Sequence, residues 1–242
     1  MKRGFTLIEL LVVISIIALL IGILLPALSS ARRTAMTMQC LSNMRQMEVA
    51  HYAYVIDNDG ELIQANLSHG GHAHGDIEPW IHTLAEGYGV DVVLQSPVDE
   101  SPHWEEELDG TLRKTSYGIN DFLDSHLVAW GPWGTGHEKG HYTMDNVRNQ
   151  SSLVHFVMMA FEGDYAVSDH GHVSGWATNT TAHLAPTNAA KEFQINAHRG
   201  PEADWKSVSN WSFLDGHAET TAFENVYQSP TENSFDPMVA GK

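Results

Sequence analysis

Residues 10–31 read LLVVISIIALLIGILLPALSSA and contain no charged side chain. At about 1.5 Å of rise per residue, a helix of this length reaches about 33 Å, which is enough to cross the hydrocarbon core of a membrane. A secretory signal usually has a shorter apolar region, of about 7–15 residues, that ends at a small-x-small site. Ala27-Leu28-Ser29 fits such a site, so the two plain interpretations of the segment are a cleaved secretory signal and a simple membrane anchor.

Charged residues flank this apolar segment on both sides. Lys2 and Arg3 favour a cytoplasmic N-terminus, while Arg32 and Arg33 on the far side weaken that preference. Glu9 lies at the edge of the apolar run, where an unpaired carboxylate is costly. We therefore expect Glu9 to have a partner of opposite charge.

The sequence from Gly4 to Glu9 (GFTLIE), after a short basic leader, resembles the class III signal of type IV prepilins and pseudopilins. The resemblance implies cleavage after Gly4 by a membrane prepilin peptidase and N-methylation of the new amine of Phe5. It also implies that Glu9 pairs with the terminal amine of a neighbouring subunit, which would leave neither charge unpaired in apolar surroundings. The chain then divides into a leader (1–4), a transmembrane and filament-core helix (5–32), and a stem with a pilin-like head (33–242).

Residues 33–56 contain neither proline nor glycine and are expected to continue the helix. One helical face is marked by side chains at steps of three and four, namely Cys40, Met44, Met47, His51 and Tyr54. This face is predicted to pack on a sheet, whereas Arg33, Arg45 and Glu48 fall largely elsewhere. Residues 57–60 (DNDG) predict the turn that ends the helix, in preference to a calcium loop, because the glycine comes too early and no bidentate glutamate follows.

After residue 56, short apolar pieces alternate with Gly, Pro, Asn and Asp, a pattern typical of short strands joined by long loops. Residues 153–161 are the best candidate for a buried strand, and 90–94 and 127–130 are shorter apolar pieces. Residues 211–219 predict a strand, a turn at Asp215-Gly216 and a second strand. The expected fold class is α+β: the long helix packs on a small antiparallel sheet of four or five strands with long loops.

Residues 210–217 (NWSFLDGH) resemble the C-terminal end of pilin-like proteins with the H-x9-DG signature, which are abundant in planctomycetes. Residues 40–47 and 115–120 resemble two further segments of these proteins. The resemblance assigns the motif to His198, Asp215 and Gly216, but sixteen residues separate the histidine from the aspartate, so either an insertion lies between them or the histidine's role is absent. Ser96 stands where the family often has a second cysteine, so Cys40 is expected to act as a small core hydrophobe.

Several side chains offer metal-binding chemistry. His69, His72, His74 and Asp76 lie on one glycine-rich loop that could hold zinc, nickel or copper, and further ligands could come from His137, His141 and residues 169–172. A solvated loop is the favoured interpretation. Residues 105–107 with Asp109 predict a solvated acidic face, with a calcium site in the head as the alternative, and no cofactor is expected to be required. The tryptophans, including Trp130 and Trp133, are expected to fill the core rather than to stack on sugars.

The net charge of −17 is divided unevenly between the two parts of the 242-residue chain. Residues 1–56 carry five basic and two acidic side chains, a net charge of +3, and the remainder therefore carries −20. An acidic head argues against nucleic-acid binding. The single cysteine excludes an intramolecular disulfide and a cysteine-based zinc cage. No Gly-x-Ser-x-Gly signature occurs, and no enzymatic activity is expected.

The resemblance to prepilins implies a structural subunit of a type IV pilus or of a pseudopilus like those of type II secretion. The implied partners are copies of the same chain in a filament, prepilin peptidase, an inner-membrane assembly platform and, before assembly, membrane lipids. The implied location is the inner membrane, crossed once with the head in the periplasm, and then a periplasmic or extracellular filament. The alternatives are a membrane-anchored metal- or ligand-binding protein, or a minor tip adhesin, that uses the signal only for export.

Overall fold

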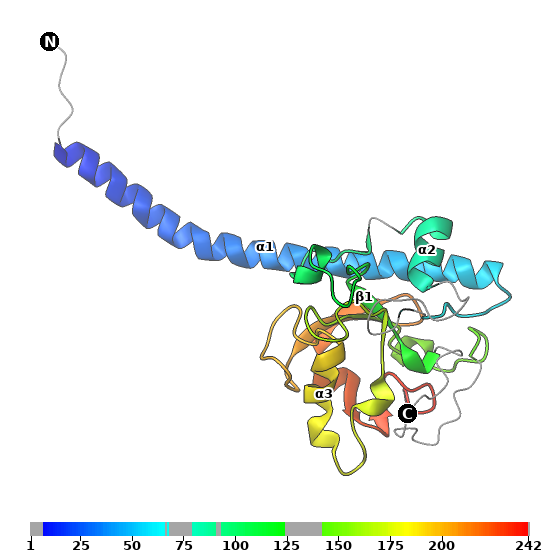
Figure 1. Ribbon diagram of the computed structural model, residues 1–242. Coiled ribbons are helices and arrows are strands. Elements are labelled where there is room, and N and C mark those ends of the chain that lie inside the picture. Colours follow the sequence, from blue (N-terminus) through cyan, green and yellow to red (C-terminus); the bar gives the residue numbers. More distant parts are fainter. Residues whose placement is uncertain (1–6, 66, 68–78, 91–92, 124–141, 242) are drawn as a thin grey trace.

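A computed structural model describes residues 7–65, 67, 79–90, 93–123 and 142–241 of the chain. It confirms the expected α+β class, with one long N-terminal helix and a head packed against the C-terminal half of that helix (Figure 1). The helix, α1, spans Leu7–Asp57 without interruption. Its N-terminal half projects away from the head and curves, whereas its C-terminal half lies along the head.

The head is built from short elements joined by loops and 3₁₀ turns. Within the described residues they are α2 (Trp80–Tyr88), β1 (Tyr117–Asn120), β2 (Phe156–Met158), β3 (His170–Gly171), α3 (Ala185–Glu192), β4 (Val208–Ser212), β5 (Ala218–Ala222), α4 (Phe223–Val226), β6 (Tyr227–Ser229) and β7 (Glu232–Asn233).

The strands form three small sheets in the described part of the chain, rather than the single antiparallel sheet of four or five strands expected from the sequence. The first has the order β2-β1-β3, in which β1 is antiparallel to β2 and parallel to β3. The other two are the antiparallel pairs β4-β5 and β6-β7. Beside β2, the His155 N–H donates to the Ser212 carbonyl at 2.8 Å, so the first two sheets meet edge to edge at this point. The expected single sheet does not form because each strand has only two to five residues and pairs with its neighbours over a short length.

The strand predictions within the described residues are confirmed for two segments. Residues 153–160, which include β2, are buried throughout. The β4-β5 hairpin turns at Asp215-Gly216, where Gly216 has φ 93° and its N–H donates to the Phe213 carbonyl at 2.8 Å. Val93 and Leu94 are buried but form no strand, and residues 127–130 lie outside the described residues.

The buried face of the C-terminal half of α1 was predicted correctly, but it is wider than predicted. Cys40, Met44, Met47 and His51 have no exposed surface, and Tyr54 is half-buried. Glu48, which was expected to lie largely on another face, is also fully buried. The reason is that α1 contacts α2 on one side and both β4 and β5 on the other, so the head covers more of the helix than one side-chain stripe.

The turn predicted after the helix is present at the expected residues. Asp59 and Gly60 have φ of 53° and 88°, and the Gly60 N–H donates to the Val55 carbonyl at 2.9 Å. A left-handed residue after the last helical turn, bonded back to the helix, is a common way to end an α-helix.

Aromatic side chains fill the centre of the head. Trp176 lies 5.2–5.8 Å, between ring centroids, from Phe193, Phe223, Tyr227 and Phe235. Trp80 and Trp211 are also buried. The prediction that tryptophans fill the core is therefore confirmed for Trp80, Trp176 and Trp211, while Trp130 and Trp133 lie outside the described residues. Cys40 is a buried free thiol, as expected.

A buried cation links the loops beside this core. The Arg113 Nε donates to Asp99 Oδ2 at 2.8 Å, and neither side chain is exposed. The guanidinium also donates to the carbonyls of Ala160 at 2.8 Å, Met159 at 3.3 Å and Ala166. Burial lowers the pKa of Arg113, and the nearby Asp99 carboxylate opposes that shift. Four acceptors around one buried guanidinium satisfy most of its donors.

Replacing Arg113 by leucine is expected to lower the free energy of unfolding by about 3–5 kcal/mol, because the buried Asp99 carboxylate is left without its counter-ion. Urea unfolding of the full chain in detergent, followed by circular dichroism, measures this change. The double variant Arg113→Leu/Asp99→Leu removes both charges and should recover part of the loss. Equal losses in the single and double variants would show that the ion pair is not the cause.

Candidate functional site: the apolar stem

The N-terminal half of α1 is apolar on every face and exposed. The large hydrophobic side chains from Leu7 to Leu28 have between 47% and 79% of their surface exposed. One window of 18 residues has a mean hydropathy of 3.1 and no residue buried against the head. Each such side chain gains about 1.5–3 kcal/mol on leaving water. The stem is therefore unstable as an isolated rod in water and requires lipid or other protein to cover it.

The polar groups of the stem are compatible with an apolar environment. The Ser15 hydroxyl donates to the Leu11 carbonyl one turn earlier, at 2.8 Å. Pro26 lies inside the helix and cannot donate to the carbonyl four residues before it. The stem curves along its N-terminal half (Figure 1), as is common where a proline interrupts the ladder of hydrogen bonds.

Glu9 lies in the first turn of α1 and is exposed. A carboxylate is favourable there because the unsatisfied N–H groups of the first turn carry partial positive charge. Gly4 and Phe5, the predicted processing residues, lie outside the described residues, so cleavage after Gly4 and the pairing of Glu9 with a neighbouring amine stay predictions.

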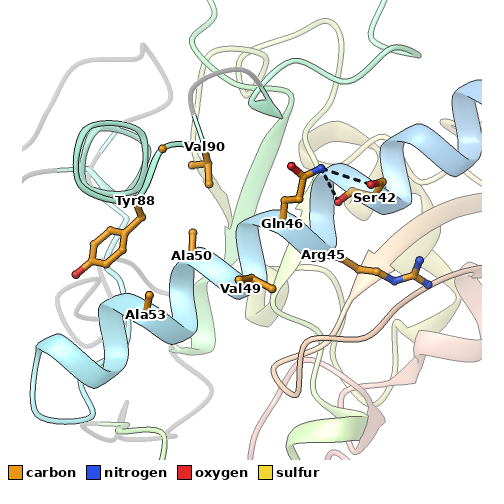
Figure 2. Close-up of a pocket in the computed structure, with 9 residues that line it drawn as sticks. Ser42, Arg45, Gln46, Val49, Ala50, Ala53, Tyr88 and Val90 are labelled. Carbon is orange, nitrogen blue, oxygen red and sulfur yellow. Dashed lines mark hydrogen bonds between the residues drawn. The ribbon is translucent and has the colours of Figure 1, made fainter.

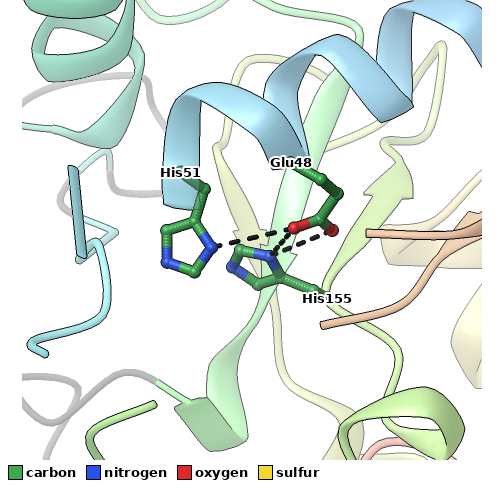
Figure 3. A group of neighbouring side chains, drawn as sticks. All are labelled: Glu48, His51 and His155. Atoms are coloured by element: carbon green, nitrogen blue, oxygen red, sulfur yellow. Dashed lines mark hydrogen bonds and ion pairs between the residues drawn. The ribbon is translucent and has the colours of Figure 1, made fainter. Parts of the chain in front are cut away.

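The C-terminal half of α1 is held to the head by buried polar contacts around Glu48 (Figure 3). The two carboxylate oxygens of Glu48 lie 3.1 Å and 3.0 Å from His155 Nδ1. The Ser212 hydroxyl donates to Glu48 Oε1 at 2.6 Å, and His51 Nδ1 lies 3.7 Å from Glu48 Oε2. Burial raises the pKa of the Glu48 carboxyl and lowers the pKa of His51 to about 4 and that of His155 to about 3.

This cluster was not predicted from the sequence, because Glu48 was expected to lie largely away from the buried face of the helix. His51 did fall on the predicted buried face. The sequence did contain one indication of the cluster. A buried histidine needs a hydrogen-bond partner, and Glu48 lies one helical turn before His51. His155 lay inside the segment correctly predicted as a buried strand, and that position carried the same signal.

The three residues of the proposed H-x9-DG motif have separate partners. His198 is buried; its Nδ1 lies 3.3 Å from Thr37 Oγ1 on α1, and its N–H donates to the Val208 carbonyl at 3.1 Å. Asp215 Oδ1 accepts from the His217 N–H at 3.1 Å and also contacts the His217 ring. His198 thus positions the stem helix against β4, and Asp215 with Gly216 forms the hairpin turn.

Burial also makes His198 a source of acid sensitivity. Its pKa is lowered from 6.5 to about 4 by desolvation, and its Nε2 has no hydrogen-bond partner. The unfolded chain therefore takes up a proton near pH 6.5 that the folded chain takes up only near pH 4. Above about pH 6.5, His198 does not change the free energy of unfolding. As the pH falls from about 6.5 to about 4, the free energy of unfolding decreases by up to about 3 kcal/mol.

The variant His198→Gln should show a shallower loss of stability between pH 6.5 and pH 4 than the wild type. Melting temperatures of both proteins at half-unit pH steps test this expectation, with His183→Gln, an exposed histidine, as the matched control. Parallel pH profiles for wild type and His198→Gln would contradict the assignment.

The other predicted metal ligands divide into described and undescribed residues. His69, His72, His74 and Asp76, together with His137 and His141, lie outside the described residues. Residues 137–141 (HEKGH) have the His-Glu-x-x-His spacing of some zinc sites. Among the described residues, His170 Nδ1 lies 2.9 Å from Asp169 Oδ1 and His172 Nδ1 lies 3.6 Å from Glu192 Oε2. Glu105, Glu106 and Glu107 are exposed, as expected of a solvated face.

A shallow groove of about 410 Å³ runs over the outer face of α1 beside Tyr88 (Figure 2). Its floor is formed by Val49, Ala50 and Ala53, with Arg45 at one end. Arg45 donates to the Ala218 carbonyl at 2.9 Å. The lining is largely aliphatic and offers no acid–base pair among the described residues, so this groove does not support a catalytic function.

Residues 1–25 match the family model described as the prokaryotic N-terminal methylation motif. No curated protein and no solved structure matches the chain. The matched segment is the class III prepilin signal, which implies a type IV pilin-like protein that is processed by prepilin peptidase. Together with the exposed apolar helix that it overlaps, the signal suggests membrane anchoring and export.

Proposed function

We propose that this protein is a non-enzymatic structural subunit of a filament, either a type IV pilus or a pseudopilus of the type II secretion kind. The observation that carries the proposal is the stem itself. An apolar helical segment, exposed from Leu7 to Leu28, overlaps the methylation signal at residues 1–25 and is continuous with the part of α1 that supports the head. A filament core of parallel stems covers such a surface.

The proposed sequence of events begins with insertion into the inner membrane, with the head in the periplasm. Prepilin peptidase cleaves after Gly4, and the new amine of Phe5 is methylated. An inner-membrane assembly platform then moves the subunit from lipid into the filament. Lipid tails and apolar side chains solvate a stem about equally well, so association of stems in the membrane gains little from the hydrophobic effect. Packing and charge pairing must therefore select the register.

Glu9 supplies that charge pairing in the proposed filament. Its carboxylate would lie against the terminal amine of Phe5 in an adjacent subunit, and both ions are stabilised by their mutual attraction in apolar surroundings. The acidic heads repel one another in the filament, since each contributes about twenty negative charges to its surface. Screening by salt, or bound cations, reduces their repulsion.

Electron microscopy of cells that produce the chain, with gold-labelled antibody against the head, tests this proposal. Gold along the length of filaments is the expected result. Gold only at filament tips would favour the tip adhesin, and gold spread over the cell envelope without filaments would favour the anchored binding protein.

A further inference from the structure

Glu48, His51 and His155 form a fully enclosed polar cluster in the described part of the chain. Their side chains are 0–1% exposed, and one potential ligand atom from each lies within 4.8 Å of the other two. Figure 3 shows the three side chains converging between α1 and the segment just before β2 that carries His155. Two imidazoles and one carboxylate are a common protein donor set for a transition metal.

The bonding of His51 is incomplete without a further group. Neither its Nδ1 nor its Nε2 has a hydrogen-bond partner, although the ring is fully buried. The contact with Glu48 Oε2, at 3.7 Å, is too long for a hydrogen bond. A buried polar atom without a partner is costly, and an unseen ion or water is one of the few explanations for it in a folded protein.

The cluster has the dimensions of a metal site. Around tetrahedral zinc, with bonds of about 2.0–2.1 Å, neighbouring ligand atoms are about 3.3 Å apart. Glu48 and His155 present atoms 3.0 Å apart, and Glu48 and His51 present atoms 3.7 Å apart. These two separations lie on either side of the tetrahedral value, and all three ligand atoms lie within 4.8 Å of one another, so an adjustment of the two imidazole rings toward a common centre would place the ligands around one ion.

The surrounding structure holds the ligands in place. Glu48 and His51 are three residues apart on α1, so they lie on neighbouring positions of one helical face. The His155 N–H donates to the Ser212 carbonyl at 2.8 Å, and its carbonyl accepts from the Asn120 N–H at 2.9 Å. The Ser212 hydroxyl fixes one oxygen of Glu48. Hydrogen bonds of this kind orient metal ligands in known sites.

We propose that Glu48, His51 and His155 bind one Zn²⁺ ion that pins the stem helix to the sheets of the head. Ser212 acts as a positioning residue for the carboxylate, and a water completes four-fold coordination. Calcium and magnesium are disfavoured because they prefer oxygen ligands. The role is structural rather than catalytic, because the enclosed side chains leave no path for a substrate.

The electrostatics of the cluster fit this assignment. The imidazole pKa values are lowered mainly by burial, so both rings are neutral at pH 7 and their nitrogens can act as ligands. The contact between Glu48 and His155 needs a proton in the absence of a metal. Zinc takes the place of that proton and at the same time gives His51 a partner.

Calorimetric titration of the full chain in detergent, stripped with a chelator and then dialysed, tests the proposal with ZnCl₂ as the probe. A background variant in which His69, His72, His74, His137 and His141 are changed to alanine removes the loop histidines that could bind zinc independently. One equivalent of zinc is expected to bind to this background variant. Its melting temperature should rise by about 5–10 °C at a zinc concentration 100-fold above the dissociation constant.

Substitutions in the same background assign the ligands. His51→Ala and His155→Ala should each weaken zinc binding by at least about 100-fold, because loss of a residue that only positions a ligand already costs about 10–100-fold. Ser212→Ala should weaken zinc binding by about 10–100-fold, as expected for a residue that only positions a ligand. His183→Ala, the exposed control, should bind like the background. With Co²⁺ in place of Zn²⁺, the visible absorption of a four-coordinate site should be lost in His51→Ala.

Two results would overturn the proposal. One is that the background variant folds but binds no zinc. This result does not depend on whether the ligand variants fold, because it is obtained without them. The other is zinc binding of unchanged affinity in His51→Ala, which would place the ion elsewhere. In either case the cluster is a hydrogen-bonded polar contact alone.

Discussion

Replacing Glu9 by alanine is expected to abolish filament assembly while leaving the chain inserted in the membrane. The apolar segment from Leu10 to Ala31 is unchanged, and it alone is long enough to span the bilayer. In the filament, however, the amine of Phe5 in the neighbouring subunit would lie in apolar surroundings without a counter-ion. An unpaired buried charge of this kind costs about 3–5 kcal/mol at every subunit contact, which is enough to stop polymerisation.

Membrane fractionation measures whether the Glu9→Ala chain inserts, and electron microscopy of sheared filaments measures whether it assembles. Ser15→Ala is the matched control, because Ser15 is an exposed stem residue whose hydroxyl bonds only one turn back along its own helix. It should insert and assemble like the wild type. Filaments of normal length and number from Glu9→Ala would refute the pairing of charges.

Replacing Gly4 by leucine is expected to block processing, so that residues 1–4 stay on the chain. A peptidase that cleaves after Gly4 needs close approach to the backbone, and a branched side chain at that position obstructs it. The retained leader also prevents formation of the Phe5 amine, so assembly should fail together with cleavage. Mass spectrometry of the N-terminal peptide detects the retained leader directly.

Gly22→Ala is the control for this variant. A Cβ atom at Gly22 meets nothing within 4 Å, so the substitution changes another glycine of the matched segment 1–25 without obstructing anything in the chain itself. It should be processed normally. Complete processing of Gly4→Leu would show that the signal is cut elsewhere or not by this kind of peptidase.

The sequence predicted the features that depend on local pattern. The apolar run, the helical spacing from Cys40 to Tyr54 and the turn at residues 57–60 each follow from a short stretch of residues, and the structure confirms all three. The hairpin turn at Asp215-Gly216 is of the same kind. In each case the physical cause, periodic burial or a backbone that favours positive φ, lies within about ten residues.

The features that depend on contacts distant in the sequence were not predictable. Glu48 is buried only because His155 and Ser212, more than a hundred positions away, supply its partners. The pattern around residue 48 indicates at most that His51 needs a polar partner, and it does not identify His155 or Ser212. The strand order β2-β1-β3, with a parallel pair, likewise depends on where the loops return the chain rather than on the strands themselves.

Mass spectrometry of the N-terminal peptide from purified filaments tests the central claim most directly. If the chain is a processed filament subunit, the peptide from the filament fraction begins at Phe5 and carries one added methyl group on its amine. A filament fraction that lacks the chain, or that holds it with residues 1–4 still attached, would contradict the account.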